Sequence, residues 1–236
     1  MSHALGVVGL PRRPCNTVVM DRPEIEFTYV GDTMCSWCWG FAPTVERLQG
    51  HYAFPMRLIN GGLRPGPNAQ ALDDDMRAYL SQAWARVAAA SGQPFNDAVL
   101  DTEGWIYDTE LPARAVVTMR AHNESQEWEF FKRLQLAFYG EGEDVTNESV
   151  YPGILNDFSV DVDAFMADLA DEKSRLAAWE DFEQAQVMQA QGFPTLLLRT
   201  GSDMATVTRG YRAFEDIEPH LTKYLAERYE PADFLA

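Results

Sequence analysis

The first part of the chain changes from an alternating pattern of apolar and polar side chains to a helical one. Over residues 24–30 apolar positions alternate with polar ones, which is the period of a half-buried strand. Residues 39–49 have helical spacing, and Gly50 is a suitable residue to end the helix. A second apolar run, residues 56–60, stops at a glycine pair. This part therefore predicts a strand, a helix and a second strand.

Helical spacing dominates the long middle of the chain, from about residue 68 to residue 191, and no strand pattern there is convincing. The apolar side chains repeat at the spacing of a helix face that packs against a core. The positions that carry this pattern are Met76, Leu80, Ala83, Trp84 and Val87; residues 114–122; Trp128, Phe131, Leu134 and Phe138; and Phe165, Leu169, Leu176 and Trp179.

The end of the chain returns to strands. Residues 196–200 and 205–209 predict a hairpin that turns around residues 201–203, and residues 214–229 predict a last helix. The whole pattern is a strand–helix–strand front, a helix-rich middle and a strand–strand–helix back. An α/β organisation with a helix-rich middle is expected.

Cys35 and Cys38, with Ser36 and Trp37 between them, lie where the first predicted strand passes into the predicted helix. Free backbone N–H groups and the helix dipole favour a thiolate over a thiol at such a position. Cys38 follows one turn later, where it can attack a mixed disulfide formed at Cys35 and release the reduced partner. This order predicts an exposed attacking thiol at Cys35 and a protected resolving thiol at Cys38.

The side chains beside the cysteines each have two interpretations. Asp32 or Thr33 can cap the helix, and we favour a cap for Asp32 over a carboxylate that accepts a proton from the dithiol. Trp37 and Trp39 can form an exposed apolar lip for unfolded substrates, with core packing as the alternative for Trp39.

A zinc site is the alternative chemistry for two cysteines at this spacing. Three cysteines cannot make a four-thiolate site, and a mixed site would need His51, His122 or His220. None of these histidines has a recognisable spacing to the pair. We therefore expect redox chemistry that uses neither a metal nor a cofactor.

The formal net charge of −17 at pH 7 limits the partners. An acidic surface repels phosphate backbones and anionic lipids, so we expect no nucleic-acid partner and no membrane partner. Three cysteines do not make a disulfide framework, and no apolar run approaches the length of a membrane span.

Residues 1–20 are predicted to be a disordered lead and not a signal peptide, because Arg12 and Arg13 follow the weakly apolar stretch and do not precede it. Met20 is a candidate natural start, and cytoplasmic localisation is expected. Cys15 is interpreted as an incidental thiol, and the alternative is a third thiol that reaches the active pair.

The run Cys-Ser-Trp-Cys-Trp-Gly-Phe, residues 35–41, resembles the active-site segment of DsbA/FrnE-like thioredoxin-fold dithiol–disulfide oxidoreductases, the predicted protein disulfide isomerase branch. This resemblance implies a cis-proline far downstream that faces the dithiol, and Pro194, in the sequence Gly-Phe-Pro-Thr, fits it. Pro194 follows Cys38 by 156 residues (194 minus 38), a gap that suits a large inserted domain.

The resemblance therefore implies an α/β thioredoxin fold with a large inserted all-helical domain. Residues 21–66 and 190–236 are expected to form the thioredoxin-fold domain, and residues 67–189 the inserted helical domain.

The resemblance also implies the residues that hold substrate. The backbone before Pro194 pairs with the substrate chain, which brings Phe193 to the substrate, and the proline shields the dithiol from metals. Ser36 and Trp37 complete the substrate-contacting set. The well-known DsbA pattern has a histidine between the cysteines, and its absence implies a less oxidising couple.

The expected function is thiol–disulfide exchange with protein thiols and disulfides, or with small thiols such as glutathione, as a reductase or isomerase. Two alternatives remain. One is a non-catalytic DsbA-like adaptor or redox switch. The other is a relative of kappa-class glutathione transferases and hydroxychromene-carboxylate isomerases, which place a serine where this chain has Cys35. The direction of electron flow and the oligomeric state stay open.

Overall fold

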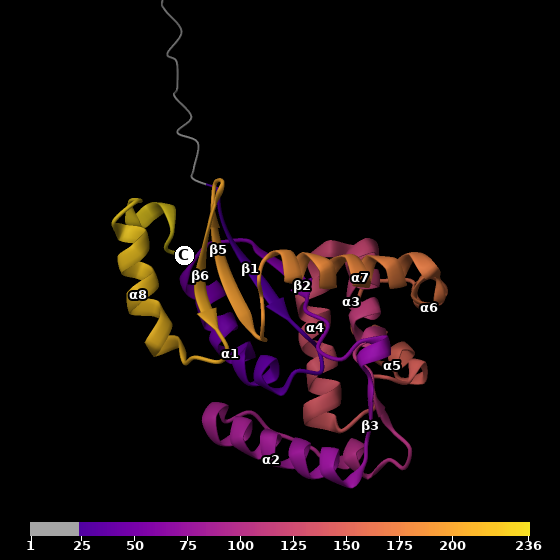
Figure 1. Cartoon of the computed structure of the whole chain (residues 1–236). Coiled ribbons are helices and arrows are strands. Elements are labelled where there is room, and N and C mark those ends of the chain that lie inside the picture. The colour runs from indigo at the N-terminus through magenta and orange to yellow at the C-terminus, as the bar shows by residue number, and fades with distance from the viewer. Residues whose placement is uncertain (1–23) are drawn as a thin grey trace, which may run out of the picture.

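A computed structural model describes residues 24–236, so the predicted lead, Cys15 and Met20 lie outside the described residues. Its main sheet has the strand order β2-β1-β5-β6 (Figure 1). β1 pairs in parallel with β2 and antiparallel with β5, and β5 pairs antiparallel with β6. The strands are β1 (Ile25–Gly31), β2 (Met56–Asn60), β5 (Thr195–Thr200) and β6 (Asp203–Arg209). The predicted strands and hairpin are confirmed, with ends that move by one or two residues.

Helices cover both faces of the sheet (Figure 1). Phe27 and Tyr29 of β1 belong to the large core on the side of α1 (Ser36–His51) and α8 (Phe214–Ala226). Val30 of β1 packs on the opposite side with Ile59 and with Ala185 of α7 (Glu172–Val187). Because successive strand residues point to opposite faces, β1 is buried on both sides, as the middle of a covered sheet requires.

α1 is longer than the predicted helix 39–49. It begins at Ser36 and runs through Gly50 to His51, where the Tyr52 N–H bonds to the Leu48 carbonyl. Tyr52 is fully buried and stacks on Phe54, so side-chain packing carries the helix beyond the glycine. Gly50 is thus an interior residue of α1 and not its end.

The chain between β2 and β5 is mainly helical, as predicted. Two short strands, which the sequence pattern did not indicate, pair antiparallel within it. A π-helical turn at Leu136–Glu141 extends the fourth helix and carries the last part of its aromatic stripe. The elements here are β3 (Gln70–Ala71), α2 (Asp74–Ser91), β4 (Ile106–Tyr107), α3 (Glu110–Asn123), α4 (Glu127–Gln135), α5 (Tyr151–Leu155) and α6 (Val162–Ala170), followed by α7.

The buried faces of these helices confirm most of the predicted positions. Leu80 and Trp84 of α2 and Phe131 of α4 are buried. Leu176 was predicted wrongly, since its side chain is 53% exposed. α7 instead buries the face that carries Ala178 and Phe182. Trp179 is partly buried and packs on Phe182, so of the two predicted positions only Leu176 lies on the exposed face.

A buried ionic network joins the helical segment to the sheet. Arg120 of α3 donates to the Asp181 carboxylate of α7 at 2.8 Å and to the Leu58 carbonyl of β2 at 3.0 Å. Its Nε donates to Glu127 of α4 at 2.7 Å. Asp181 also accepts from the side-chain amide of Asn60, at 2.8 Å. One guanidinium therefore holds three helices against one strand.

No helix within residues 24–236 has the length and apolar character needed to cross a membrane.

Candidate active site

Cys35 and Cys38 are free thiols on the first turn of α1. Cys35 is the residue before the helix and has an extended backbone, and its carbonyl accepts the N–H groups of Cys38 at 2.9 Å and Trp39 at 3.1 Å. Cys35 is 6% exposed and Cys38 is 0% exposed. The expected order of exposure is present, but the first thiol reaches solvent only slightly.

The cysteine pair faces a loop that is distant in the sequence. The Cys35 thiol donates to the Phe193 carbonyl at 3.6 Å, and the Phe193–Pro194 peptide bond is cis. The Pro194 carbonyl accepts from the Gly210 N–H at 2.7 Å, which ties this loop to the end of β6. The chain that enters β5 therefore lies directly against the dithiol.

The Phe193 side chain turns away from the cysteines. Its ring lies so close to Gly61, just after β2, that a methyl group on that glycine would overlap it. The ring also packs on the small cluster of Val30 and Ile59. The Phe193 backbone, and not its ring, is the part that faces the dithiol.

Two aromatic rings lie at the surface next to the cysteines. Trp37 is half-buried, and its ring centroid is 5.6 Å from that of Tyr211, in the loop after β6. Trp39 is buried and donates from Nε1 to the Pro94 carbonyl at 2.9 Å, so it belongs to the core. The predicted lip thus consists of Trp37 and Tyr211, with Trp39 excluded. No sequence signal singled out Tyr211.

Asp32 does not cap α1, and the prediction that it or Thr33 would do so was wrong. α1 begins four residues after Asp32, and no described side chain caps it. The Asp32 carboxylate instead accepts N–H groups from Met34 at 2.9 Å and from Leu63 at 2.8 Å. This carboxylate links the cysteine loop to the loop after β2.

Burial changes the acid–base chemistry behind the cysteines. It raises the pKa of Asp32 to about 6, against the two N–H groups that lower it. It also raises the pKa of the Cys38 thiol well above its ordinary value, helped by the neighbouring Cys35. The Asp32 N–H lies 3.5 Å from the Cys38 sulfur and opposes this rise. Cys38 is therefore held as a thiol at neutral pH.

Three buried tyrosines surround the inner side of the dithiol loop. The Tyr107 hydroxyl donates to the Met34 carbonyl. The hydroxyls of Tyr29 and Tyr139 make no hydrogen bond with the described residues. Burial raises the pKa of all three phenols, so they remain protonated and can only donate or accept as neutral groups. Sequence reasoning singled out none of the three hydroxyls.

Within residues 24–236 there is no group of three or more histidine, cysteine, aspartate or glutamate side chains arranged to hold a metal ion.

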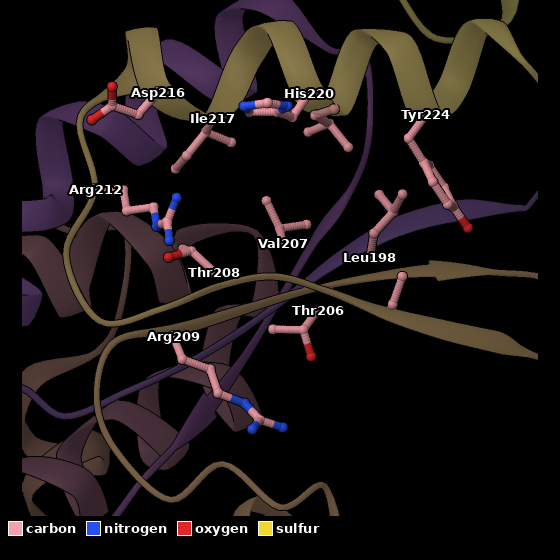
Figure 2. Close-up of a pocket in the computed structure, with 12 residues that line it drawn as sticks. Leu198, Thr206, Val207, Thr208, Arg209, Arg212, Asp216, Ile217, His220 and Tyr224 are labelled. Atoms are coloured by element: carbon pink, nitrogen blue, oxygen red, sulfur yellow. The ribbon is translucent and has the colours of Figure 1, made fainter.

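A groove of about 500 Å³ lies between β6 and α8 (Figure 2). Leu198, Val207 and Ile217 supply its apolar lining, and the exposed Arg212 and His220 contribute charge and polarity. Neither cysteine lines this groove. It is a feature of the sheet edge, separate from the dithiol.

Known proteins resemble the chain in sequence and in fold. The family model described as a DSBA-like thioredoxin domain matches residues 27–218. The crystal structure of a putative protein disulfide isomerase from Nitrosomonas europaea has a TM-score of 0.78 at 30% identity, covering 88% of this chain and 100% of the other. The cytosolic disulfide reductase DsbM from Pseudomonas aeruginosa, also solved with GSH, has a TM-score of 0.71 at 23% identity, covering 86% of this chain and 99% of DsbM.

A curated relative carries a different kind of name. The ClpXP adapter protein SpxH of Shouchella clausii is 23% identical over 198 residues, which cover 83% of this chain. The chain spans 64% of the length of that relative.

Proposed function

Because the chain belongs to the DSBA-like thioredoxin domain family, we propose that it exchanges disulfides with thiol substrates through Cys35 and Cys38. The observation that carries this proposal is the asymmetry of the pair. Cys35 starts α1 and contacts the loop before Pro194, while Cys38 is fully buried one turn further along. A two-step exchange requires a first thiol that the substrate can reach and a second thiol that is shielded. Cys35 is the less buried of the two residues, at 6% exposed against 0% for Cys38.

In the reducing direction, the Cys35 thiolate attacks a substrate disulfide. A sulfur–sulfur bond forms between Cys35 and one substrate sulfur, and the other substrate sulfur leaves as a thiolate. Cys38 then attacks the Cys35 sulfur, closes the Cys35–Cys38 disulfide and releases the second substrate thiol. The substrate gains two electrons and the protein dithiol loses two, so a reducing thiol must regenerate the dithiol.

Four residues are proposed to hold the substrate beside Cys35. The backbone of Phe193 and Pro194 faces the thiol and can run alongside an extended substrate segment. Trp37 lies at the surface with Tyr211 and offers an apolar contact, while the partly buried Ser36 sits between the cysteines.

Protein disulfides and small thiols such as glutathione are the proposed substrates and reductants. The structure of DsbM with GSH supports a small thiol, and the description of DsbM as cytosolic supports the expected cytoplasmic localisation. The putative isomerase from Nitrosomonas europaea supports isomerase activity as well as reductase activity. In a reducing compartment the pair would rest as the dithiol.

The proposal is tested by insulin reduction driven by dithiothreitol, with the wild type and Cys35→Ser, alongside a glutathione redox titration of the pair. Catalysis by the wild type and its loss in Cys35→Ser are expected. Cys15→Ser is the matched control, because it also removes one thiol but not one of the residues proposed for the site. Insulin reduction by Cys35→Ser at the wild-type rate would contradict the proposal.

The relatives named as ClpXP adapters support a second candidate, a protein that presents a client and does not catalyse exchange. The same experiment separates the two. A dithiol that titrates with glutathione but does not accelerate insulin reduction would favour the adaptor, with the cysteine pair as a redox switch. Equal binding of a purified client to the wild type and to Cys35→Ser would then identify a binding function independent of the thiol.

A further inference from the structure

Tyr29 is a fully buried residue of β1 whose hydroxyl has no hydrogen-bond partner among the described residues. Its ring is held by aromatic neighbours, with Trp128 at 5.2 Å and Phe131 at 5.9 Å between centroids, and it stacks on Phe41 at 6.4 Å. Buried hydroxyls without partners are costly and uncommon in native proteins. A buried phenol that is held in place without a hydrogen-bond partner therefore suggests a functional role for its hydroxyl.

Gly31 makes room for this phenol. The Tyr29 ring lies across Gly31, so close that a methyl group there would overlap the ring edge and approach the hydroxyl at 3.1 Å. Gly31 is followed by Asp32, whose N–H points at the Cys38 sulfur. The missing side chain thus lets the ring reach along the strand to the end where the cysteine loop begins.

The titratable groups around this point are few. Tyr29 has Cys38, Cys35 and Asp32 as its charged or titratable neighbours. The rings that pack on it from α1 and α4 carry no charge. Phe41, on which the Tyr29 ring stacks, lies one helical turn after Cys38 on α1, so the unpartnered hydroxyl is on the side of Cys38. Of these neighbours, Cys38 is the one to which the phenol can donate, and such a bond would lower the pKa that burial of Cys38 raises.

A thiol accepts hydrogen bonds weakly, whereas a thiolate accepts them strongly. The phenol therefore has little to donate to while Cys38 is protonated. Cys38 becomes a thiolate only when it attacks, and again when a reductant cleaves the Cys35–Cys38 disulfide and Cys38 leaves. Burial raises the pKa of Tyr29, so its proton stays on oxygen throughout.

Resting on the proposed exchange reaction, we infer that the Tyr29 hydroxyl donates a hydrogen bond to the Cys38 thiolate and, with the Asp32 N–H, makes Cys38 able to resolve the mixed disulfide. In this step Cys38 forms a bond to the Cys35 sulfur, and the bond from Cys35 to the substrate sulfur breaks. The substrate sulfur leaves with the electron pair, and in net terms the proton of Cys38 ends on the released thiol.

The test uses the reduced full-length protein with Cys15→Ser, since the third thiol would also react. The reagent is the small aromatic disulfide dithiobis(nitrobenzoate), followed by stopped-flow absorbance. Attack by Cys35 releases a first thionitrobenzoate, and resolution by Cys38 releases a second. Tyr29→Phe should leave the first phase unchanged and slow the second about threefold at neutral pH. Loss of one charge-assisted hydrogen bond lowers the ionised fraction of Cys38 about tenfold at neutral pH. The less stabilised thiolate is a better nucleophile, which offsets part of this loss.

A titration isolates the effect on Cys38. In a Cys35→Ser background, carbon NMR of labelled Cys38 should show its pKa higher by about one unit when Tyr29→Phe is added. A ring-fluorinated tyrosine at position 29 has a hydroxyl that is a stronger donor, so it should speed the second phase and lower the pKa of Cys38. Tyr29→Phe keeps the ring packing and removes an unpaired hydroxyl, so its unfolding midpoint should equal or exceed that of the wild type. If the hydroxyl had a purely structural role, the rate of the second phase would not change.

Tyr151→Phe is the matched control, because it removes a buried phenol that donates to the Val145 carbonyl and has neither cysteine among its neighbours. Both phases should match the wild type. The inference is overturned if Tyr29→Phe gives the wild-type second phase and the wild-type Cys38 titration. The reagent needs only the two thiols, so a protein that failed to reduce insulin would still give both phases and still test Tyr29.

Discussion

At the scale of single residues, the candidate site depends on a difference between two sulfurs that lie one helical turn apart. Cys35 contacts the Phe193 carbonyl and touches solvent, and Cys38 touches neither. Burial keeps Cys38 protonated, while the end of β1 supplies the Asp32 N–H that can stabilise its thiolate. This difference supports the proposed attack by Cys35 and resolution by Cys38.

Cys38→Ser should accumulate mixed disulfides at Cys35, because the first attack remains possible and the resolving thiol is gone. Mass spectrometry of the variant after incubation with oxidised insulin or glutathione disulfide should find the adduct. Cys35→Ser should form no adduct at Cys38 under the same conditions, since Cys38 is 0% exposed. An adduct mapped to Cys38 at a yield comparable to that at Cys35 would show that the buried thiol also attacks.

Trp37→Ala tests the proposed substrate contact. Its ring and that of Tyr211 form the surface lip beside Cys35. We expect kcat/KM for insulin to fall by about tenfold, the typical loss for an aromatic anchor. The reaction with a small aromatic disulfide should change by less than about twofold, because a small reagent does not need the lip. An equal loss in both reactions would place Trp37 in the chemistry of the dithiol itself.

At the scale of secondary-structure elements, α1 must pack closely on α2 to hold the dithiol in place. Gly40, two residues after Cys38, is the point of closest approach, and a methyl group there would lie 2.6 Å from a Val87 methyl. The Gln93 side chain, just beyond the end of α2, donates to the Trp39 carbonyl at 3.1 Å. The absence of a side chain at Gly40 allows this packing.

Gly40→Ala should destabilise the protein by about 1–3 kcal/mol, because the overlap with a stiff β-branched side chain outweighs the better helix propensity of alanine. Gly50→Ala, in the same helix, has nothing within 4 Å of its added methyl group. It should stabilise by roughly 0.5 kcal/mol. Urea midpoints of the two variants measure both changes. Equal shifts would mean that α2 moves freely away from α1.

At the scale of the whole molecule, Arg120 holds the helical segment to the sheet, and its charge balance depends on pH. It faces two carboxylates, Asp181 and Glu127, so the buried network carries an excess negative charge when both are ionised. Burial raises the pKa of Glu127 to about 7, against the lowering effect of Arg120. A proton on Glu127 therefore favours the folded state.

This shift predicts a pH-dependent contribution to stability with a defined sign. The folded-state pKa of Glu127 lies above its ordinary 4.5, so its contribution is fully present below pH 4.5 and is lost as pH rises through about 7. The free energy of unfolding of the wild type, relative to Glu127→Gln, should fall by roughly 3 kcal/mol across this window. Urea unfolding of both proteins at several pH values measures this change. If the difference in the free energy of unfolding between wild type and Glu127→Gln did not depend on pH, the raised pKa of Glu127 would be contradicted.

Sequence patterns alone were enough to predict the strands β1, β2, β5 and β6, the dithiol at the start of α1 and the predominance of helix between β2 and β5. These features depend on local alternation, helix termini and turns, which a short stretch of chain contains. The resemblance to DsbA-like oxidoreductases added the cis-proline, which the structure places against Cys35. The boundaries of the inserted domain and the roles of the site residues stay predictions.

Only the tertiary structure decided which groups meet. The periodicity marked Tyr29 as buried but could not show that its hydroxyl lies against Gly31 without a hydrogen-bond partner, next to the residue whose N–H contacts Cys38. Local rules made Asp32 a helix cap, whereas its carboxylate accepts from the Met34 N–H and from the N–H of Leu63, 31 residues away. Leu176 has helical spacing but lies on the exposed face of α7. The physical reason is common to all three. The spacing of apolar residues shows which face of a helix or strand is apolar, but the fold determines which other elements pack against that face.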